Sequence, residues 1–128
     1  MMSHKSTSTL RILATAGVVL FGLASQQAMA HAHLKTETPA ANAVVTSSPT
    51  ELTLGFSEGV EPSFSKVEVN GPDNKPVKTG AFTLAEKDNT QVLIPLPTPL
   101  TSGKYQVSWH VVSVDGHKTQ GQYIFTVK

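Results

Sequence analysis

The sequence predicts one small all-β domain, an antiparallel Greek-key sandwich or barrel of six or seven strands. Short segments alternate apolar and polar residues with the period of two that a half-buried strand requires. Gly, Pro, Asn or Asp separates these segments at intervals of about 8 to 15 residues, which is typical of such folds. No stretch of helical length shows the period of about 3.6 residues that a helix needs. The length of 128 residues fits a single domain.

Six segments carry the alternation most clearly. They are residues 51–56, 65–70, 81–86, 90–96, 103–112 and 121–128. The residues expected to face the core are Leu52, Leu54, Phe56, Val67, Val69, Phe82, Leu84, Tyr105, Val107, Trp109, Val111, Tyr123, Phe125 and Val127. His110 falls on the opposite face of its strand, so we expect it at the surface. The Pro-containing stretches 70–76 and 97–103 are expected to be a turn and a loop.

The first thirty residues have the features of a secretion signal. Two basic residues and no acidic one precede an apolar run over residues 12–24. A run of about 13 residues suits the core of a signal peptide and is too short to span a membrane. The triplet Ala28-Met29-Ala30 has the form that signal peptidase accepts. We therefore expect residues 1–30 to be a cleaved Sec signal peptide and residues 31–128 to be a soluble domain in a Gram-negative periplasm; a retained, anchoring helix is the alternative.

The sulfur content and the net charge exclude several kinds of metal site and of binding partner. The chain has no Cys, which excludes a disulfide framework, a zinc finger, an iron–sulfur cluster and a thiolate copper site. Its net charge of +1 lacks the basic excess of a nucleic-acid binder. All three Met and one of the five His lie in the segment that cleavage removes. The remaining 98 residues carry eight Lys and nine acidic residues, a net charge of −1, and four His.

Cleavage after Ala30 would make His31 the first residue, with a free α-amine. An unperturbed α-amine has a pKa of about 7.7 to 8.0, low enough for a metal to displace its proton near neutral pH. The amine and the imidazole of one residue can then close a chelate ring, and such nitrogen ligands suit Cu(II). The other interpretation is a His that stands at this position by chance.

Two further features complete the candidate site: the pair Asp115 and His117, and the carboxylate of Glu58. Asp115 and His117 are two residues apart, so their side chains can converge on one spot, either along a strand or across an Asp-Gly turn. The alternative is an ordinary hairpin turn with His117 in solvent. Glu58 follows the strand over 51–56 in a turn, where its carboxylate could orient a metal-binding His or simply be solvated.

These motifs resemble the CopC family of periplasmic copper-binding proteins, in particular its short members. The resemblance rests on HAHLKTETPAANAVV, on F-S-E in FSEGV, and on V-S-x-D-x-H in LTSGKYQVSWHVVSVDGHKTQGQYIFTVK, and it covers essentially residues 31–128. It implies a seven-stranded cupredoxin-like, Ig-like β-barrel. It also implies one Cu(II) per chain, bound by the amine and imidazole of His31 with Asp115 and His117, and Glu58 as a supporting partner or weak axial contact. Because residues 31–128 contain no Met, we expect no thioether site for Cu(I).

His33 offers a competing arrangement. A free amine followed by His at position three chelates Cu(II) or Ni(II) through the amine, two deprotonated amides and the imidazole. We favour the family arrangement, because Asp115 and His117 belong to a folded domain and no amide has to lose its proton. His33 is then an outer or alternative ligand, or an exposed surface residue.

The expected function is non-enzymatic copper binding for homeostasis or resistance, by sequestration or by delivery to an inner-membrane partner of the CopD type. The exported protein is expected to be a monomer with no nucleic-acid partner. Two other classes compete. A small copper oxidase acting on polysaccharides also uses an N-terminal His, but it needs an exposed aromatic binding face. A metal-free Ig-like adhesion or assembly module would bind no stoichiometric copper.

Overall fold

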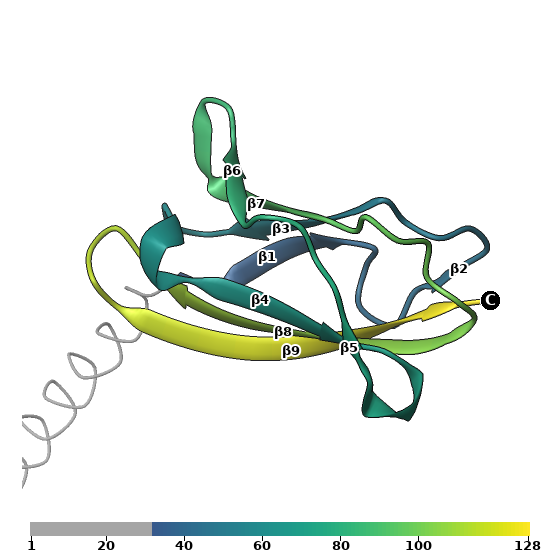
Figure 1. Cartoon of the computed structure of the whole chain (residues 1–128). Helices are drawn as coiled ribbons and strands as arrows, with labels where there is room; N and C mark the ends of the chain where they lie inside the picture. The colour runs from purple at the N-terminus through teal and green to yellow at the C-terminus, as the bar shows by residue number, and fades with distance from the viewer. Residues whose placement is uncertain (1–31) are drawn as a thin grey trace, which may run out of the picture. The chain divides into compact units, whose positions relative to one another are not determined.

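The computed structural model describes residues 32–128, so the expected signal peptide and His31 lie outside the described residues. Within this range the chain folds into two β-sheets that face each other (Figure 1). In the same range, no helix is both long enough and apolar enough to cross a membrane.

The two sheets have four and five strands. The first has the order β1-β3-β7-β6 and the second the order β2-β9-β8-β4-β5. The first sheet consists of β1 (Leu34–Thr38), β3 (Glu51–Phe56), β6 (Thr83–Ala85) and β7 (Asp88–Pro95). The second consists of β2 (Val44–Val45), β4 (Lys66–Asn70), β5 (Pro76–Val77), β8 (Gly103–Val112) and β9 (Lys118–Val127). Two short 3₁₀ helices, η2 (Pro62–Phe64) and η3 (Pro72–Asn74), flank β4.

The apolar faces predicted from the alternation form the core between the sheets. The buried side chains at these positions are Leu52, Leu54, Phe56, Val67, Val69, Tyr105, Val107, Trp109, Val111, Tyr123, Phe125 and Val127. Phe82 and Leu84, also predicted to face the core, are only partly buried and pack against it. The ring of Phe56 meets that of Trp109 edge-on at 5.2 Å between centroids, and this contact joins β3 of one sheet to β8 of the other. Removing this apolar surface from water stabilises the sandwich without a disulfide.

All six predicted strands are present, and the all-β, two-sheet class is confirmed. Three further strands were not predicted: β1 and the two-residue strands β2 and β5. No residue of β1 is fully buried, so its sequence shows no clear alternation. β2 pairs with β9 in parallel, whereas the other strand pairs of the described chain are antiparallel. Seven of the nine strands in residues 32–128 have three or more residues.

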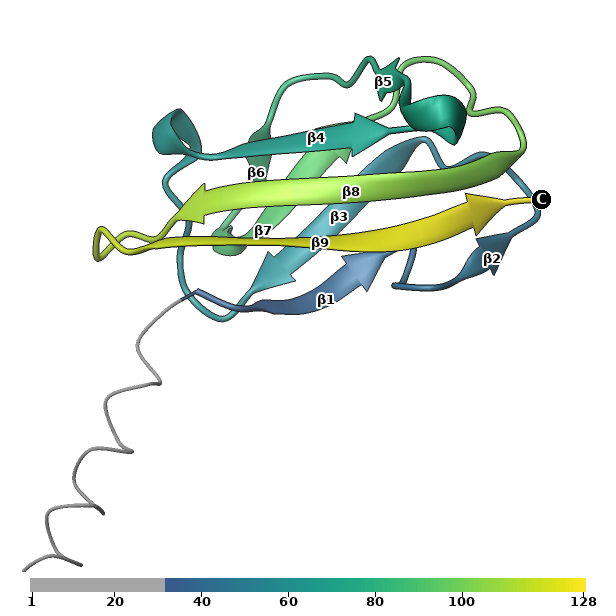
Figure 2. The same cartoon turned by 90° about the horizontal axis from the view of Figure 1, so that it is seen from below.

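The topology brings three segments to one end of the sandwich. β8 and β9 form a long hairpin whose last register pair is Val112 with Lys118. The turn of this hairpin lies at the same end as the start of β1 and the end of β3 (Figure 2). Three segments therefore meet at this end: the first described residues, the F-S-E segment (residues 56–58) and the turn that carries Asp115 and His117, called the D-x-H turn below.

Candidate metal centre

The turn between β8 and β9 presents Asp115 and His117 side by side. The Ser113 N–H donates to the His117 carbonyl at 2.9 Å, and the Gly116 N–H donates to the Ser113 carbonyl at 2.8 Å. Gly116 has a φ of 89°, a conformation that glycine adopts without steric cost. These bonds close the turn and hold the two side chains near each other.

Both oxygens of the Asp115 carboxylate have a partner. The Ser113 hydroxyl donates to Oδ1, and Nδ1 of His117 lies 3.0 Å from Oδ2. The hydrogen bond from Ser113, followed by the one from His117, lowers the pKa of Asp115 to about 2. The carboxylate is therefore ionised at neutral pH. The side chains of His117 and Asp115 are 47% and 45% exposed, so a cation in solution can reach them.

The segment 57–61 is hydrogen-bonded to this turn. The carbonyl of Gly59 accepts from the Val114 N–H at 2.9 Å, and the Glu61 N–H donates to the Val112 carbonyl at 2.8 Å. Backbone bonds of this kind fix the position of one loop relative to the other without any side chain. The D-x-H turn is thus attached to the chain that leaves β3.

Ser57, in the same segment, also binds the start of the described chain. Its Oγ accepts from the His33 N–H at 2.8 Å, and its own N–H donates to the His33 carbonyl at 2.9 Å. Ala32 has no exposed surface and belongs to the core. One loop therefore connects the D-x-H turn to the two residues that follow His31.

Comparison with known proteins identifies the family of this chain. The CopC domain model matches residues 34–128. The chain belongs to the CopC family. It is 49% identical over 122 residues to Protein YobA of Escherichia coli (strain K12), covering 94% of this chain and 98% of that protein. It is 34% identical to Copper resistance protein C of Xanthomonas campestris pv. juglandis, covering 91% of this chain and 95% of that protein.

A solved structure is similar as well. The crystal structure of PcoC, a methionine-rich copper resistance protein from Escherichia coli, has a TM-score of 0.69 at 34% identity, covering 77% of this chain and 100% of that one. The family and its relation to copper, expected from the motifs, are thereby confirmed. Unlike the methionine-rich PcoC, this CopC chain has no Met or Cys in residues 32–128. The metal-binding side chains available in that range therefore offer nitrogen and oxygen atoms and no sulfur.

The other candidate residues are placed as follows. Glu58 is exposed in the bend after β3, and His33 is exposed beside Ser57. His110 is exposed on β8, as predicted. Within residues 32–128 no group of three or more His, Cys, Asp and Glu side chains is arranged to hold a metal ion. The roles of Glu58 and His33 toward a metal stay predictions, and so does the ligand set, because His31 lies outside the described residues.

Sequence reasoning gave no role to two serines that hydrogen-bond to candidate residues. Ser113 is fully buried and binds Asp115, while Ser57 binds His33. The first contact has a local signal, since a Ser two residues from an Asp at a turn commonly makes hydrogen bonds within that turn. The second has none, because its partners are 24 positions apart.

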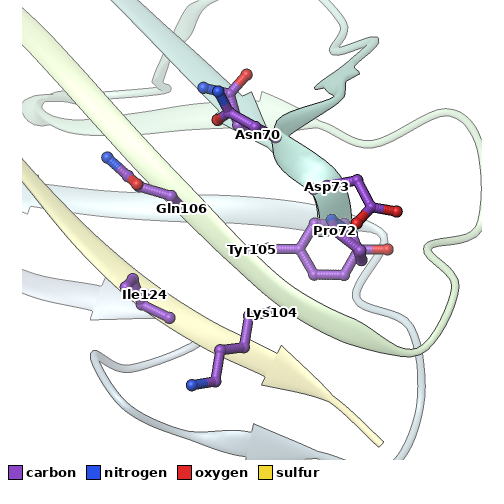
Figure 3. A pocket seen from close by; sticks show the side chains of 9 residues that line it. Asn70, Pro72, Asp73, Lys104, Tyr105, Gln106 and Ile124 are labelled. Carbon is purple, nitrogen blue, oxygen red and sulfur yellow. The ribbon is translucent and has the colours of Figure 1, made fainter.

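A shallow hollow at the other end of the sandwich has different chemistry. It has a volume of about 210 Å³ and lies between η3, β8 and β9 (Figure 3). Asp73 is the one carboxylate among its lining residues, and no His is among them. The Tyr105 hydroxyl there donates to the Thr101 carbonyl at 2.6 Å. This hollow lacks the convergent nitrogen and oxygen donors of the D-x-H turn.

Proposed function

We propose that the chain is a periplasmic, non-enzymatic copper carrier that binds one Cu(II) through His31, Asp115 and His117. In this proposal residues 1–30 are a signal peptide, and their removal creates the amine of His31. The observation that carries the proposal is the hydrogen-bonded Asp115–His117 pair, at the end of the sandwich where β1 begins.

The donor set suits the metal. The amine and imidazole of His31, the carboxylate of Asp115 and the imidazole of His117 would give three nitrogens and one oxygen. Cu(II) prefers a square-planar or tetragonal set of such donors. A carboxylate has about four lone-pair positions, so Asp115 can keep its two hydrogen bonds and still bind a cation. Its contact with Nδ1 also orients the His117 ring, as carboxylates commonly do for metal-binding histidines.

Preorganisation supports tight binding at this place. The turn is closed by backbone hydrogen bonds, and the segment 57–61 is bonded to it. Copper binding would therefore need little further ordering of Asp115 and His117, and little conformational entropy would be lost there. The low pKa of Asp115 adds to this, since no proton has to leave the carboxylate before a cation binds.

The proposed role is copper homeostasis or resistance, by sequestration or by delivery to an inner-membrane partner of the CopD type. The similarity to proteins named Copper resistance protein C supports this role. The half-exposed side chains of Asp115 and His117 suit transfer, because ligands of a partner could reach the metal.

The distribution of aromatic side chains supports a carrier over a polysaccharide oxidase. Five rings are buried in the core: Phe56, Tyr105, Trp109, Tyr123 and Phe125. Phe64 is 73% exposed, but one exposed ring in residues 32–128 does not make a flat face on which a sugar chain can stack. We expect the copper-loaded protein to produce no oxidised sugars when a reductant is supplied.

The proposed site requires that the exported chain begin at His31 with a free amine. The mass of the exported protein is expected to be that of 98 residues beginning at His31. This protein and the same protein with one added N-terminal Gly are then titrated with Cu(II). The added residue keeps every side chain but separates the free amine from the His31 imidazole, so binding should weaken sharply. Equal affinity of the two chains would contradict the proposed site.

A further inference from the structure

We propose that Ser57 determines the mode of metal binding at the N-terminus. By bonding to the His33 amide, it prevents residues 31–33 from chelating a metal through their backbone nitrogens. This inference deepens the proposed function and rests on it in one respect, namely that the exported chain begins at His31.

A chain that begins His-Ala-His has two ways to bind a square-planar metal. In one, the amine and imidazole of His31 act together with ligands from the folded domain. In the other, the amine, the amide nitrogens of Ala32 and His33, and the His33 imidazole surround the metal in one plane. Both need the same amine, so each chain can use only one of them.

In the structure, the His33 amide nitrogen that the second mode needs already takes part in a hydrogen bond. The His33 N–H points to Oγ of Ser57 at 2.8 Å, and the His33 carbonyl accepts from the Ser57 N–H at 2.9 Å. A metal bound to the His33 nitrogen would have to replace that proton and break its bond to Ser57. Because the bonds run both ways, the peptide groups on both sides of His33 are fixed, and the β1–β3 ladder continues directly from them at Leu34 and Phe56.

Ala32 opposes the same rearrangement. It has no exposed surface and is part of the core. Wrapping residues 31–33 around a metal in one plane would pull Ala32 out of its packing. The His33 side chain, in contrast, is exposed. The backbone, and not the imidazole, is therefore the part of the second mode that the fold makes unavailable.

Ni(II) is the probe that separates the two modes. Bound by an amine, two amide nitrogens and an imidazole, it is square-planar, low-spin and coloured. The chain beginning at His31 and its Ser57→Ala variant are titrated with Ni(II) at one fixed pH while the visible spectrum is recorded. Since a hydrogen bond typically contributes a factor of about 2 to 12 in an equilibrium constant, Ser57→Ala should bind Ni(II) in the coloured form about tenfold more tightly.

Three further chains serve as controls. Ser57→Thr keeps a hydroxyl at the position and should behave like the native chain. Ser108→Ala removes a hydroxyl from the outer face of β8 and should also behave like it. Ser57→Ala combined with His33→Ala lacks the third-position imidazole and should lose the coloured complex, which identifies the residues that form it.

Two results would overturn the proposal. One is equal formation of the coloured Ni(II) complex by the native chain and by Ser57→Ala. The other is a gain in Ser57→Ala that persists when His33 is also replaced. Should Ser57→Ala fail to fold, hydrogen exchange of the native chain decides instead. The His33 amide is expected to exchange at least about tenfold more slowly than an unprotected amide. Exchange at the unprotected rate would refute the proposal that Ser57 holds this amide.

The proposed function is tested separately. If His117→Ala leaves Cu(II) affinity unchanged, the proposed copper site is wrong. The nickel and exchange measurements on Ser57 do not involve His117 and keep their meaning in that case.

Discussion

The two ends of the sandwich differ in how their loops are connected. At the end with the D-x-H turn, hydrogen bonds join three separate segments: the residues before β1, residues 57–61 and residues 113–117. At the other end, the hollow beside η3 is lined by Lys104 and other polar side chains (Figure 3). The Tyr105 hydroxyl there bonds to a carbonyl only four positions away.

The comparison shows what a candidate metal site needs beyond polar residues. Both ends carry them, but at one end a carboxylate and an imidazole lie 3.0 Å apart on a turn bonded to its neighbours. Preorganised donors bind a cation at little cost in entropy, whereas polar side chains that are not held together must first be ordered. Four predictions test this difference between the ends, from the largest expected effect to the smallest.

The largest effect is expected from removing the imidazole of the D-x-H turn. Replacing a residue that only orients a metal ligand typically costs about 10- to 100-fold in affinity. His117→Ala removes a proposed ligand itself, so Cu(II) affinity should fall by at least about 100-fold. Isothermal titration measures it, with Lys104→Ala at the opposite end as the matched control. A similar loss in both variants would remove the distinction between the ends.

A smaller effect is expected from the buried hydroxyl beneath the pair. Ser113→Ala removes the hydrogen bond to Oδ1 of Asp115, and the carboxylate is then less firmly placed and less acidic. We expect Cu(II) affinity to fall by about tenfold, the lower part of the range for residues that support a ligand. Ser108→Ala, on the outer face of the same hairpin, should bind copper like the native chain. Wild-type affinity in Ser113→Ala would show that this hydroxyl does not matter.

The acidity of Asp115 gives a pH-dependent prediction. Its pKa of about 2 in the folded chain lies below the value of about 3.9 expected in an unfolded one. The bonds to its ionised form therefore favour folding fully above about pH 4, and this contribution is lost as the pH falls toward 2. NMR titration of the metal-free protein should give a midpoint near the lower value and a higher one in Ser113→Ala. An ordinary midpoint in the native chain would contradict the hydrogen-bonded turn.

The smallest effect on copper is expected at the far end. Tyr105→Phe removes the hydrogen bond to the Thr101 carbonyl but keeps the ring that stacks on Phe125 at 5.5 Å. The free energy of unfolding should fall by about 1 kcal/mol, with no change in Cu(II) affinity. Denaturant unfolding and copper titration of the same preparation measure both quantities. Weaker copper binding would mean that the two ends are coupled.

The sequence predicts the long strands well and the short ones poorly, for a physical reason. In β8 and β9 each core-facing residue alternates with an outward one, so burial is encoded in the local order of residues. The strand β2 has two residues, and it exists because β9 lies beside it. Its partner is more than 70 positions away in the chain, and no local pattern reports such a pairing.

In the candidate site, too, local features could be predicted from the sequence and contacts between distant segments could not. Asp115 and His117 can be predicted together because their spacing and the glycine between them are local. The bond between Ser57 and His33 depends on how β1 lies against β3, and so it appears only in the folded chain. Family resemblance supplied the relation to copper, which the comparisons confirm.

The central claim is that His31 and His117 bind one Cu(II) together, and nitrogen counting by electron paramagnetic resonance tests it most directly. The stoichiometric Cu(II) complex of the chain beginning at His31 should show three nitrogens in the copper plane: the amine and two imidazoles. His117→Ala should reduce the number to two. Four nitrogens, as in the amide chelate, or a spectrum that His117→Ala leaves unchanged, would contradict the account.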